Sequence, residues 1–212
     1  MDPDDQEFWN ELYDDERYPP EFEPSPFLRE HIDSVPDGRA LDVACGVGRN
    51  TVYLAEDSYV VDGLDFSDIA LSKCRTVARE KGVLRDVNLV RCDLGSFSFP
   101  EEEYDLVLVN YHHSLDLLHS LKDSIAPGGF LVYVHHLRTK DEVDHGPNKP
   151  KVPNPDRFRF RSNELLHSCL DLRIHDYRER RYMYPDGNNS AVCELLAEKP
   201  GEDRGYVTEN RS

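Results

Sequence analysis

The chain has 212 residues, of which 42 are acidic and 25 basic, and its formal charge at pH 7 is −17. A surface of this sign repels nucleic acids and anionic membranes, which argues against a nucleic-acid substrate. No apolar run reaches the roughly 20 residues that a membrane-spanning helix needs, and the acidic start MDPDDQEFWNE is unlike a secretory or basic targeting peptide. We therefore expect a single-domain, soluble cytoplasmic protein.

Two further features of the composition bear on habitat and metal binding. Only seven of the 25 basic residues are lysine. This bias, together with the acid excess, suggests a halophilic protein adapted to high salt, and an ordinary acidic cytosolic protein is the alternative. The five cysteines are scattered without a CxxC pair, which predicts reduced thiols, no disulfide framework and no metal site.

The N-terminal residues 1–37 are predicted to form a helical cap. Aromatic residues at helical spacing within residues 7–18 indicate a short amphipathic helix whose aromatic face packs on the body. A second helix follows, with Ser25 as its N-cap and Pro26 at the first helical position.

Residues 38–137 are predicted to be a cofactor-binding core in which strands alternate with helices. This alternation predicts an α/β fold, with a parallel sheet covered by helices on both faces. The predicted strands are residues 39–44, 58–65, 86–92, 104–111 and 129–136, and the predicted helices are residues 49–56, 68–82 and 114–125. Ser67 is the predicted N-cap of the helix at residues 68–82, which ends at Gly82.

The pattern changes after residue 137. Residues 138–161 are rich in proline and are predicted to form a lid loop. Residues 162–199 are predicted to contain a short helix and two antiparallel strands joined at the turn PDGNN. The tail, residues 200–212, is predicted to be disordered.

The sequence ACGVGRN joins the first predicted strand to the helix after it. Gly46 and Gly48 allow a ligand to approach the backbone, and the N–H groups at the helix start point toward that ligand. Asn50 stands where the fingerprint of dinucleotide-binding proteins has its third glycine. The loop alone therefore predicts a nucleotide-like ligand without specifying which one.

Acidic residues at successive strand ends make this prediction more specific. Asp65, at the end of the second strand, can accept hydrogen bonds from both ribose hydroxyls, and Asp93, after the third, can accept one from the adenine amino group. Asp42 enters the glycine loop, where a carboxylate disfavours a diphosphate and suits an ammonium or sulfonium group. We expect an adenosine site, and the competing interpretation is a dinucleotide site in an NAD-dependent oxidoreductase.

Together these motifs resemble the class I S-adenosylmethionine-dependent methyltransferases over about residues 8–199. The resemblance rests on LDVACGVGRN, VDGLDFSDIAL, RCDLGSF and YDLVLVNYHH, and the forms ACGxGRN, DFS and NPDRFRFRSNELL resemble the tellurite-resistance and thiopurine-like branch. It implies a three-layer Rossmann-like methyltransferase fold, a seven-stranded, mostly parallel sheet with an antiparallel last strand, and S-adenosyl-L-methionine as the cofactor. Ala44 departs from the pattern, because many members have a glycine there.

The resemblance also implies roles for individual residues. The methionine part of the cofactor would be surrounded by Asp42, Cys45, Gly46 and Gly48, with Asn50 completing the loop. Asp65 would bind the ribose, and the adenine would contact Phe66, Asp93 and Leu94. Asn110, at the end of the fourth strand, would close the cofactor site.

The sequence NYHH at the end of the fourth strand bears on the methyl acceptor. It differs from the NPPY or DPPY of enzymes that methylate amino groups in nucleic acids, which favours a small-molecule acceptor such as a thiol, a chalcogen oxyanion or another small polar nucleophile. His112 and His113 are candidate catalytic residues, and His135 and His136 end the neighbouring strand. One of them could act as a general base, or all of them could only shape the pocket.

Two hypotheses on the acceptor and on catalysis remain open at this point. Residues 138–161 hold seven basic and four acidic residues, so this loop could favour an anionic acceptor, or its bases could pair with the acidic body. A non-catalytic S-adenosylmethionine-binding protein is a further alternative to an enzyme.

As a strand-end acid, Asp65 is expected to contribute little to the stability of the protein without ligand.

Overall fold

The structure is a computed structural model that describes residues 3–14, 22–138, 158–183 and 189–201. Most of the predicted lid loop, residues 139–157, lies outside the described residues. Residues 184–188, which include most of the predicted turn, and residues 202–212 of the predicted tail also lie outside them. Within the described part of the chain, no helix is long and apolar enough to cross a membrane.

Seven strands form one sheet in the order β3-β2-β1-β4-β5-β7-β6. Strand β7 runs antiparallel to both of its neighbours, and the pairs among the first five strands are parallel, which confirms the predicted fold class. The order reverses between β1 and β4, and ligands of such sheets bind at this reversal, outside the carboxyl ends of the strands. The strands are β1 Arg39–Val43, β2 Val60–Asp65, β3 Val87–Arg91, β4 Tyr104–Asn110, β5 Ile125–His136, β6 Arg173–Met183 and β7 Asn189–Glu198.

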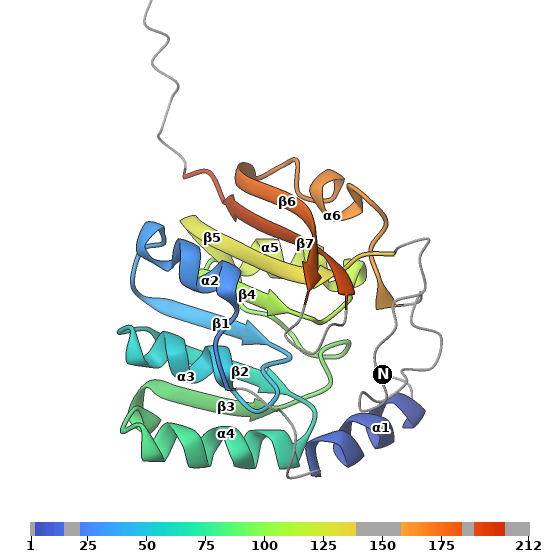
Figure 1. Cartoon of the computed structure of the whole chain (residues 1–212). Helices are drawn as coiled ribbons and strands as arrows, with labels where there is room; N and C mark the ends of the chain where they lie inside the picture. Colours follow the sequence, from blue (N-terminus) through green and yellow to red (C-terminus); the bar gives the residue numbers. More distant parts are fainter. Residues whose placement is uncertain (1–2, 15–21, 139–157, 184–188, 202–212) are drawn as a thin grey trace, which may run out of the picture.

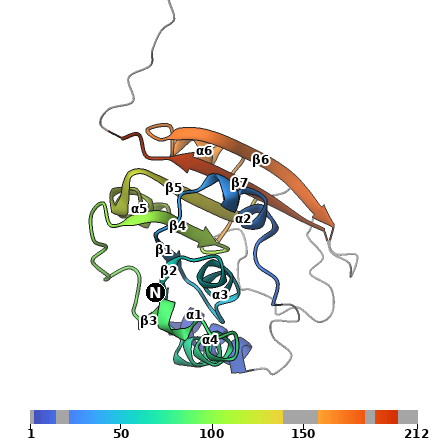
Figure 2. The ribbon, with the colours of Figure 1, turned by 90° about the vertical axis from the view of Figure 1, so that its left-hand side faces the viewer.

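Helices cover both faces of this sheet (Figure 2). On one face, Phe27 and Leu28 of α2 and Leu54 of α3 pack in one apolar cluster with β4 and β5. On the other, Leu118 of α5 and Leu165 of α6 join a larger cluster. The helices are α1 Pro3–Asp14, α2 Pro26–His31, α3 Arg49–Glu56, α4 Asp68–Glu80, α5 Leu115–Ser124 and α6 Glu164–His167, with 3₁₀ turns at Ile32–Ser34 and Leu84–Asp86.

The two predicted serine caps have different outcomes. The Ser67 hydroxyl accepts the N–H of Ala70 at 3.2 Å and caps α4 as predicted. Ser25 is the N-cap residue of α2 and Pro26 follows it, as predicted, but the Ser25 side chain makes no capping hydrogen bond. Instead, the backbone N–H of Ser25 donates to Oδ1 of Asn50 at 2.8 Å and ties the start of α2 to α3.

Helix α1 lies beside the carboxyl ends of the parallel strands, at the end toward which their arrows point (Figure 1). Its Trp9 and Tyr13 rings stack with centroids 6.0 Å apart. The Tyr13 hydroxyl reaches the glycine loop, since a Cβ placed on Gly46 would lie 2.9 Å from it. The predicted aromatic face of α1 therefore contacts the part of the body where we expect the cofactor.

Candidate functional site

The loop between β1 and α3 is held in conformations that favour glycine. Ala44, Gly46 and Gly48 all have positive φ, at 56°, 56° and 82°. A Cβ on Gly48 would lie 2.0 Å from Sγ of Cys74 in α4, so this position needs glycine for space as well as for φ. At Ala44 the left-handed conformation is strained, because the Cβ of alanine lies too close to the following carbonyl oxygen.

Asp65 at the end of β2 stabilises this loop. The side chain is 2% exposed, and its two oxygens accept the N–H of Gly46 at 2.8 Å and of Ser67 at 2.9 Å. Burial raises the pKa of Asp65, and the backbone N–H groups oppose that rise. The expectation that Asp65 contributes little to stability is therefore wrong, because its removal would leave two N–H groups in the interior without an acceptor.

Asp42 lies beneath the same loop. It is 1% exposed, and its Oδ2 accepts the Thr51 hydroxyl at 2.6 Å. Burial raises the pKa of Asp42 to about 7, and the Thr51 hydrogen bond and the positive charge of Arg49 limit the rise. Asp42 thus changes its charge near neutral pH, beside a loop where a cationic ligand would stabilise the ionised form.

The end of β3 lies next to the end of β2, because the N–H of Cys92 donates to the carbonyl of Asp65 at 2.9 Å. Asp93 follows at the surface, and the N–H of Gly95, at 3.0 Å, lowers the pKa of its carboxyl. Phe66 is partly exposed. Leu94 is 5% exposed and its side chain belongs to the apolar core, so only its backbone is available to a ligand.

Two residues that were predicted to bind the cofactor direct their side chains toward other parts of the protein. Cys45 is 8% exposed, its sulfur faces Gly63, and burial raises the pKa of its thiol well above the usual range. Asn50 is 4% exposed and gives its Oδ1 to Ser25. The side chain of Cys45 and the Oδ1 atom of Asn50 therefore support the loop.

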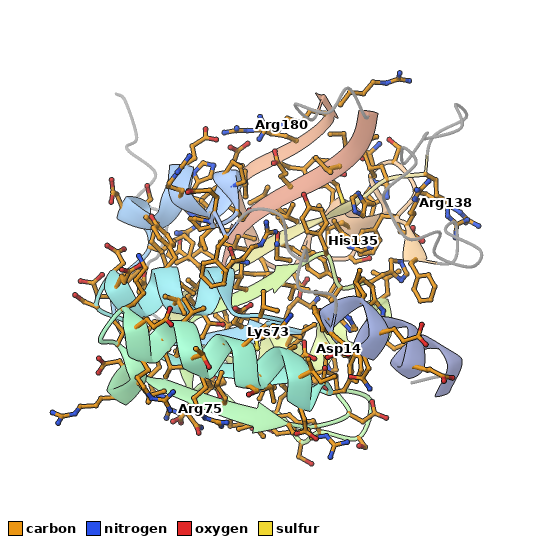
Figure 3. The ribbon with its side chains drawn as sticks, turned by 60° about the horizontal axis from the view of Figure 1, so that its bottom comes forward. Asp14, Lys73, Arg75, His135, Arg138 and Arg180 are labelled. Atoms are coloured by element: carbon orange, nitrogen blue, oxygen red, sulfur yellow. The ribbon has the colours of Figure 1, made fainter. Side chains whose placement is uncertain are left out.

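Histidine and aromatic rings gather at the ends of β4 and β5. The His113 ring lies 5.5 Å from that of His135 and 4.6 Å from that of Phe160. His135 is 3% exposed; its Nε2 bonds to the carbonyl of Phe158, and its Nδ1 has no partner among the described residues. Figure 3 shows His135 inside the molecule and Arg138, which follows β5, at its edge.

Comparisons with known proteins identify the domain. Residues 40–129, which include the glycine loop and Asp65, match the family described as a methyltransferase domain. In the solved structure of TehB from Haemophilus influenzae, 81% of this chain aligns with 61% of that chain at a TM-score of 0.66 and 20% identity. Residues 40–129 thus resemble a methyltransferase domain, and the chain shares the fold of TehB.

Two curated relatives are longer than this chain. Hemagglutinin 1 of Eikenella corrodens is 24% identical in an alignment of 192 residues that covers 82% of this chain and 59% of the relative. The ubiquinone/menaquinone biosynthesis C-methyltransferase UbiE of Shewanella sp. (strain W3-18-1) is 27% identical over 116 residues, 51% of this chain and 46% of the relative. The chain thus spans about half to three fifths of these relatives.

The imidazoles of His112, His113 and His135 are neutral at pH 7. Burial, with the positive charge of His113 when protonated, lowers the pKa of His112 to about 4, and burial also lowers the pKa of His113 and of His135. A group with so low a pKa is a weak proton acceptor, which favours a pocket-shaping role for His112. Among the described residues, no group of three or more His, Cys, Asp or Glu side chains is placed to hold a metal ion.

Sequence reasoning missed three residues that the structure places at this site. Thr51 holds Asp42, and the Arg49 guanidinium lies over the ring of Tyr111. Thr51 and Arg49 lie in the first turn of the helix after the glycine loop, so their position in the sequence could have predicted that they lie near the site. Tyr111 gave no signal, because its positive φ follows from how β4 ends against β5.

Proposed function

We propose that the chain binds S-adenosylmethionine across the carboxyl ends of β1, β2 and β4 and transfers its methyl group to a small molecule. The observation that carries this proposal is the buried Asp42 beneath a glycine loop, with Asp65 and Asp93 at the next two strand ends. We also propose a single domain over residues 1–199, a cytoplasmic location and no nucleic-acid partner, on the strength of the sequence and its charge.

Each acid has a role in this proposal. A carboxylate has about four acceptor sites, so Asp65 can bind the ribose hydroxyls while it keeps its two backbone N–H groups. Asp93 is exposed and can accept the adenine amino group. Asp42 supplies negative charge beneath the methionine part, whereas a buried acid at this place would repel the diphosphate of NAD.

The chemistry needs alignment more than proton transfer. Methyl transfer from a sulfonium is an in-line displacement that consumes a positive charge, so the protein must hold the nucleophile, methyl carbon and sulfur in line and exclude water. The rings of His113, His135 and Phe160 would form the wall on the acceptor side. His113 could accept a proton from a neutral nucleophile, and an anionic nucleophile would need no base.

The charge around these rings supports an anionic or strongly polarised acceptor. The stretches 110–113, 135–138 and 158–161 contain no acidic residue and include Arg138, Arg159 and Arg161. Two acids oppose this positive charge, because both Glu164 and Asp116 act electrostatically on His113. Oε2 of Glu164 also accepts the N–H of Arg161 at 2.7 Å. We propose a small thiolate, a chalcogen oxyanion or a similar nucleophile as the acceptor.

Calorimetry tests the cofactor. S-adenosylmethionine should bind and NADH should not, and the affinity for S-adenosylmethionine should fall about tenfold from pH 7.5 to pH 5.5. The sign follows from Asp42: its pKa near 7 in the free protein means that a proton must leave before the carboxylate can face the cation, and this costs more at lower pH. Binding of NADH alone would support the oxidoreductase alternative.

The Asp42→Asn variant is the control for the pH effect. Asparagine keeps an oxygen for the Thr51 hydroxyl but has no proton to lose, so its weaker binding should vary less with pH over the same range. An equal pH dependence in the parent and the variant would assign the titration to another group.

Transfer of a labelled methyl group tests the acceptor. With a panel of thiols, chalcogen oxyanions, phenols and amines, the highest kcat/KM should belong to an anionic acceptor. The Arg138→Gln variant should raise KM about tenfold for that acceptor and leave KM for a neutral one within twofold. Arg75→Gln on α4 is the control. Cofactor binding without turnover of any panel member would favour the non-catalytic alternative.

A further inference from the structure

Tyr111, directly after β4, has a backbone conformation that favours glycine. Its φ is +62°, and its N–H donates to the carbonyl of Val134 in β5 at 2.8 Å. A bulky residue at positive φ is a strained exception in proteins, and such strain gathers at functional sites. Tyrosine thus stands at a position where glycine would be less strained.

The contacts of the ring suggest its role. The Tyr111 ring stacks on His136 with centroids 4.6 Å apart and planes 26° from parallel. The guanidinium carbon of Arg49 lies 5.7 Å from the Tyr111 centroid, within the range of a cation–π contact. Tyr111 thus contacts both the end of β5 and the first residue of α3, and helps to set the direction of the arginine beside the glycine loop.

Arg49 has no ion pair with a carboxylate among the residues that the structure describes, although the chain holds 42 acids. Other arginines of the fold, such as Arg39, Arg178 and Arg180, are paired. Asp42 attracts Arg49 only at longer range, because its Oδ2 accepts the Thr51 hydroxyl. A partly buried guanidinium without a carboxylate partner can bind an anionic group of a ligand.

Asn110 adds a complementary group next to Tyr111. Its Oδ1 is buried and has no hydrogen-bond partner within the described part of the chain. Leu106 and Leu108 of β4 face the cluster beneath α2 and α3, so strand alternation places Asn110 on the same face as Arg49. An oxygen that lacks a donor and a guanidinium that lacks an anion together match the ammonium and carboxylate of an α-amino acid.

We propose that Tyr111 is a positioning residue that holds Arg49 to bind the α-carboxylate of the cofactor, while Oδ1 of Asn110 accepts its α-ammonium group. The proposal rests on the proposed function, because S-adenosylmethionine supplies the amino-acid end. It assigns a binding role to Arg49 and explains why the chain keeps a strained tyrosine at the end of β4.

Two probes measured by calorimetry separate the amino-acid end from the rest of the cofactor. S-adenosylhomocysteine contains that end, and 5′-deoxy-5′-methylthioadenosine contains only the adenosine and the thioether. Arg49→Gln should weaken binding of S-adenosylhomocysteine about 10- to 100-fold and leave methylthioadenosine within threefold. Arg49→Lys should lose part of that affinity, since an ammonium lacks the bidentate fork. Arg29→Gln in α2 is the matched control and should change neither probe.

Variants of Tyr111 test positioning apart from folding. Tyr111→Phe keeps the stack and should bind both probes as the parent does. Tyr111→Gly relieves the strain and removes the ring, so its affinity for S-adenosylhomocysteine should fall about 5- to 20-fold while its affinity for methylthioadenosine stays unchanged. Its melting temperature should stay closer to that of the parent than the melting temperature of Tyr111→Ala does.

The outcomes distinguish this proposal from the proposed function. A parent protein that binds neither probe nor S-adenosylmethionine overturns both. A parent that binds both probes, with Arg49→Gln weakening them equally or not at all, overturns only the assignment of Arg49. If Tyr111→Gly binds both probes like the parent while Arg49→Gln loses S-adenosylhomocysteine alone, Arg49 keeps its role and Tyr111 does not position it.

Discussion

Gly48→Ala should lower the free energy of unfolding by about 2–5 kcal/mol, since two penalties add. The first is conformational, because the φ of Gly48 is +82° and a Cβ is strained there. The second is steric, because that Cβ would lie 2.0 Å from Sγ and 2.8 Å from Cβ of Cys74, which is fully buried in α4. Chemical denaturation of the ligand-free protein measures the sum.

Gly82→Ala is the matched control for this prediction. Gly82 has nearly the same φ, +78°, but a Cβ there would meet nothing within 4 Å. It should cost only the conformational part, about 1–2 kcal/mol. If the two variants were equally destabilised, the contact between the loop and α4 would be looser than the structure shows. A double variant with Cys74→Ala should recover part of the loss at Gly48 by removing the sulfur.

Asp65→Ala should lower both stability and cofactor affinity. Without ligand, the variant leaves the N–H groups of Gly46 and Ser67 without an acceptor in the interior, which should cost about 2–4 kcal/mol of unfolding free energy. The affinity for S-adenosylmethionine should fall by about 2–3 kcal/mol, because the charged acceptor of the ribose hydroxyls is lost. Denaturation and calorimetry on the same preparation measure the two effects.

Asp93→Ala provides the comparison. Asp93 is exposed and its carboxylate accepts the N–H of Gly95 in a surface turn. Its removal should therefore keep the free energy of unfolding within about 0.5 kcal/mol of the parent, while the affinity for the cofactor should still fall. If Asp65→Ala kept the affinity of the parent, Asp65 would be a structural residue of the loop and the ribose would bind elsewhere.

The local sequence determined most of the fold. Apolar blocks of five to seven residues such as RALDV and YDLVLVN, separated by amphipathic segments, predicted the strands of the parallel sheet, because only buried strands are apolar on both faces. Ser67 and Gly82 marked the limits of α4, since capping and positive φ are satisfied within a few residues. The glycine loop and the three acids predicted a cofactor site at one sheet edge, because the carboxyl ends of parallel strands meet there.

The tertiary structure alone decided how the side chains at that edge are used. Asp65 pairs with the loop, Asn50 with Ser25 and Asp42 with Thr51; the pairs of Asp65 and Asn50 join elements 19 and 25 residues apart. The low pKa of His112 follows from burial, and the strained φ of Tyr111 follows from the junction of β4, β5 and α3. Residue type shows that a side chain can accept a proton or a hydrogen bond. Which partner it meets, and how much water remains around it, depends on segments that only folding brings together.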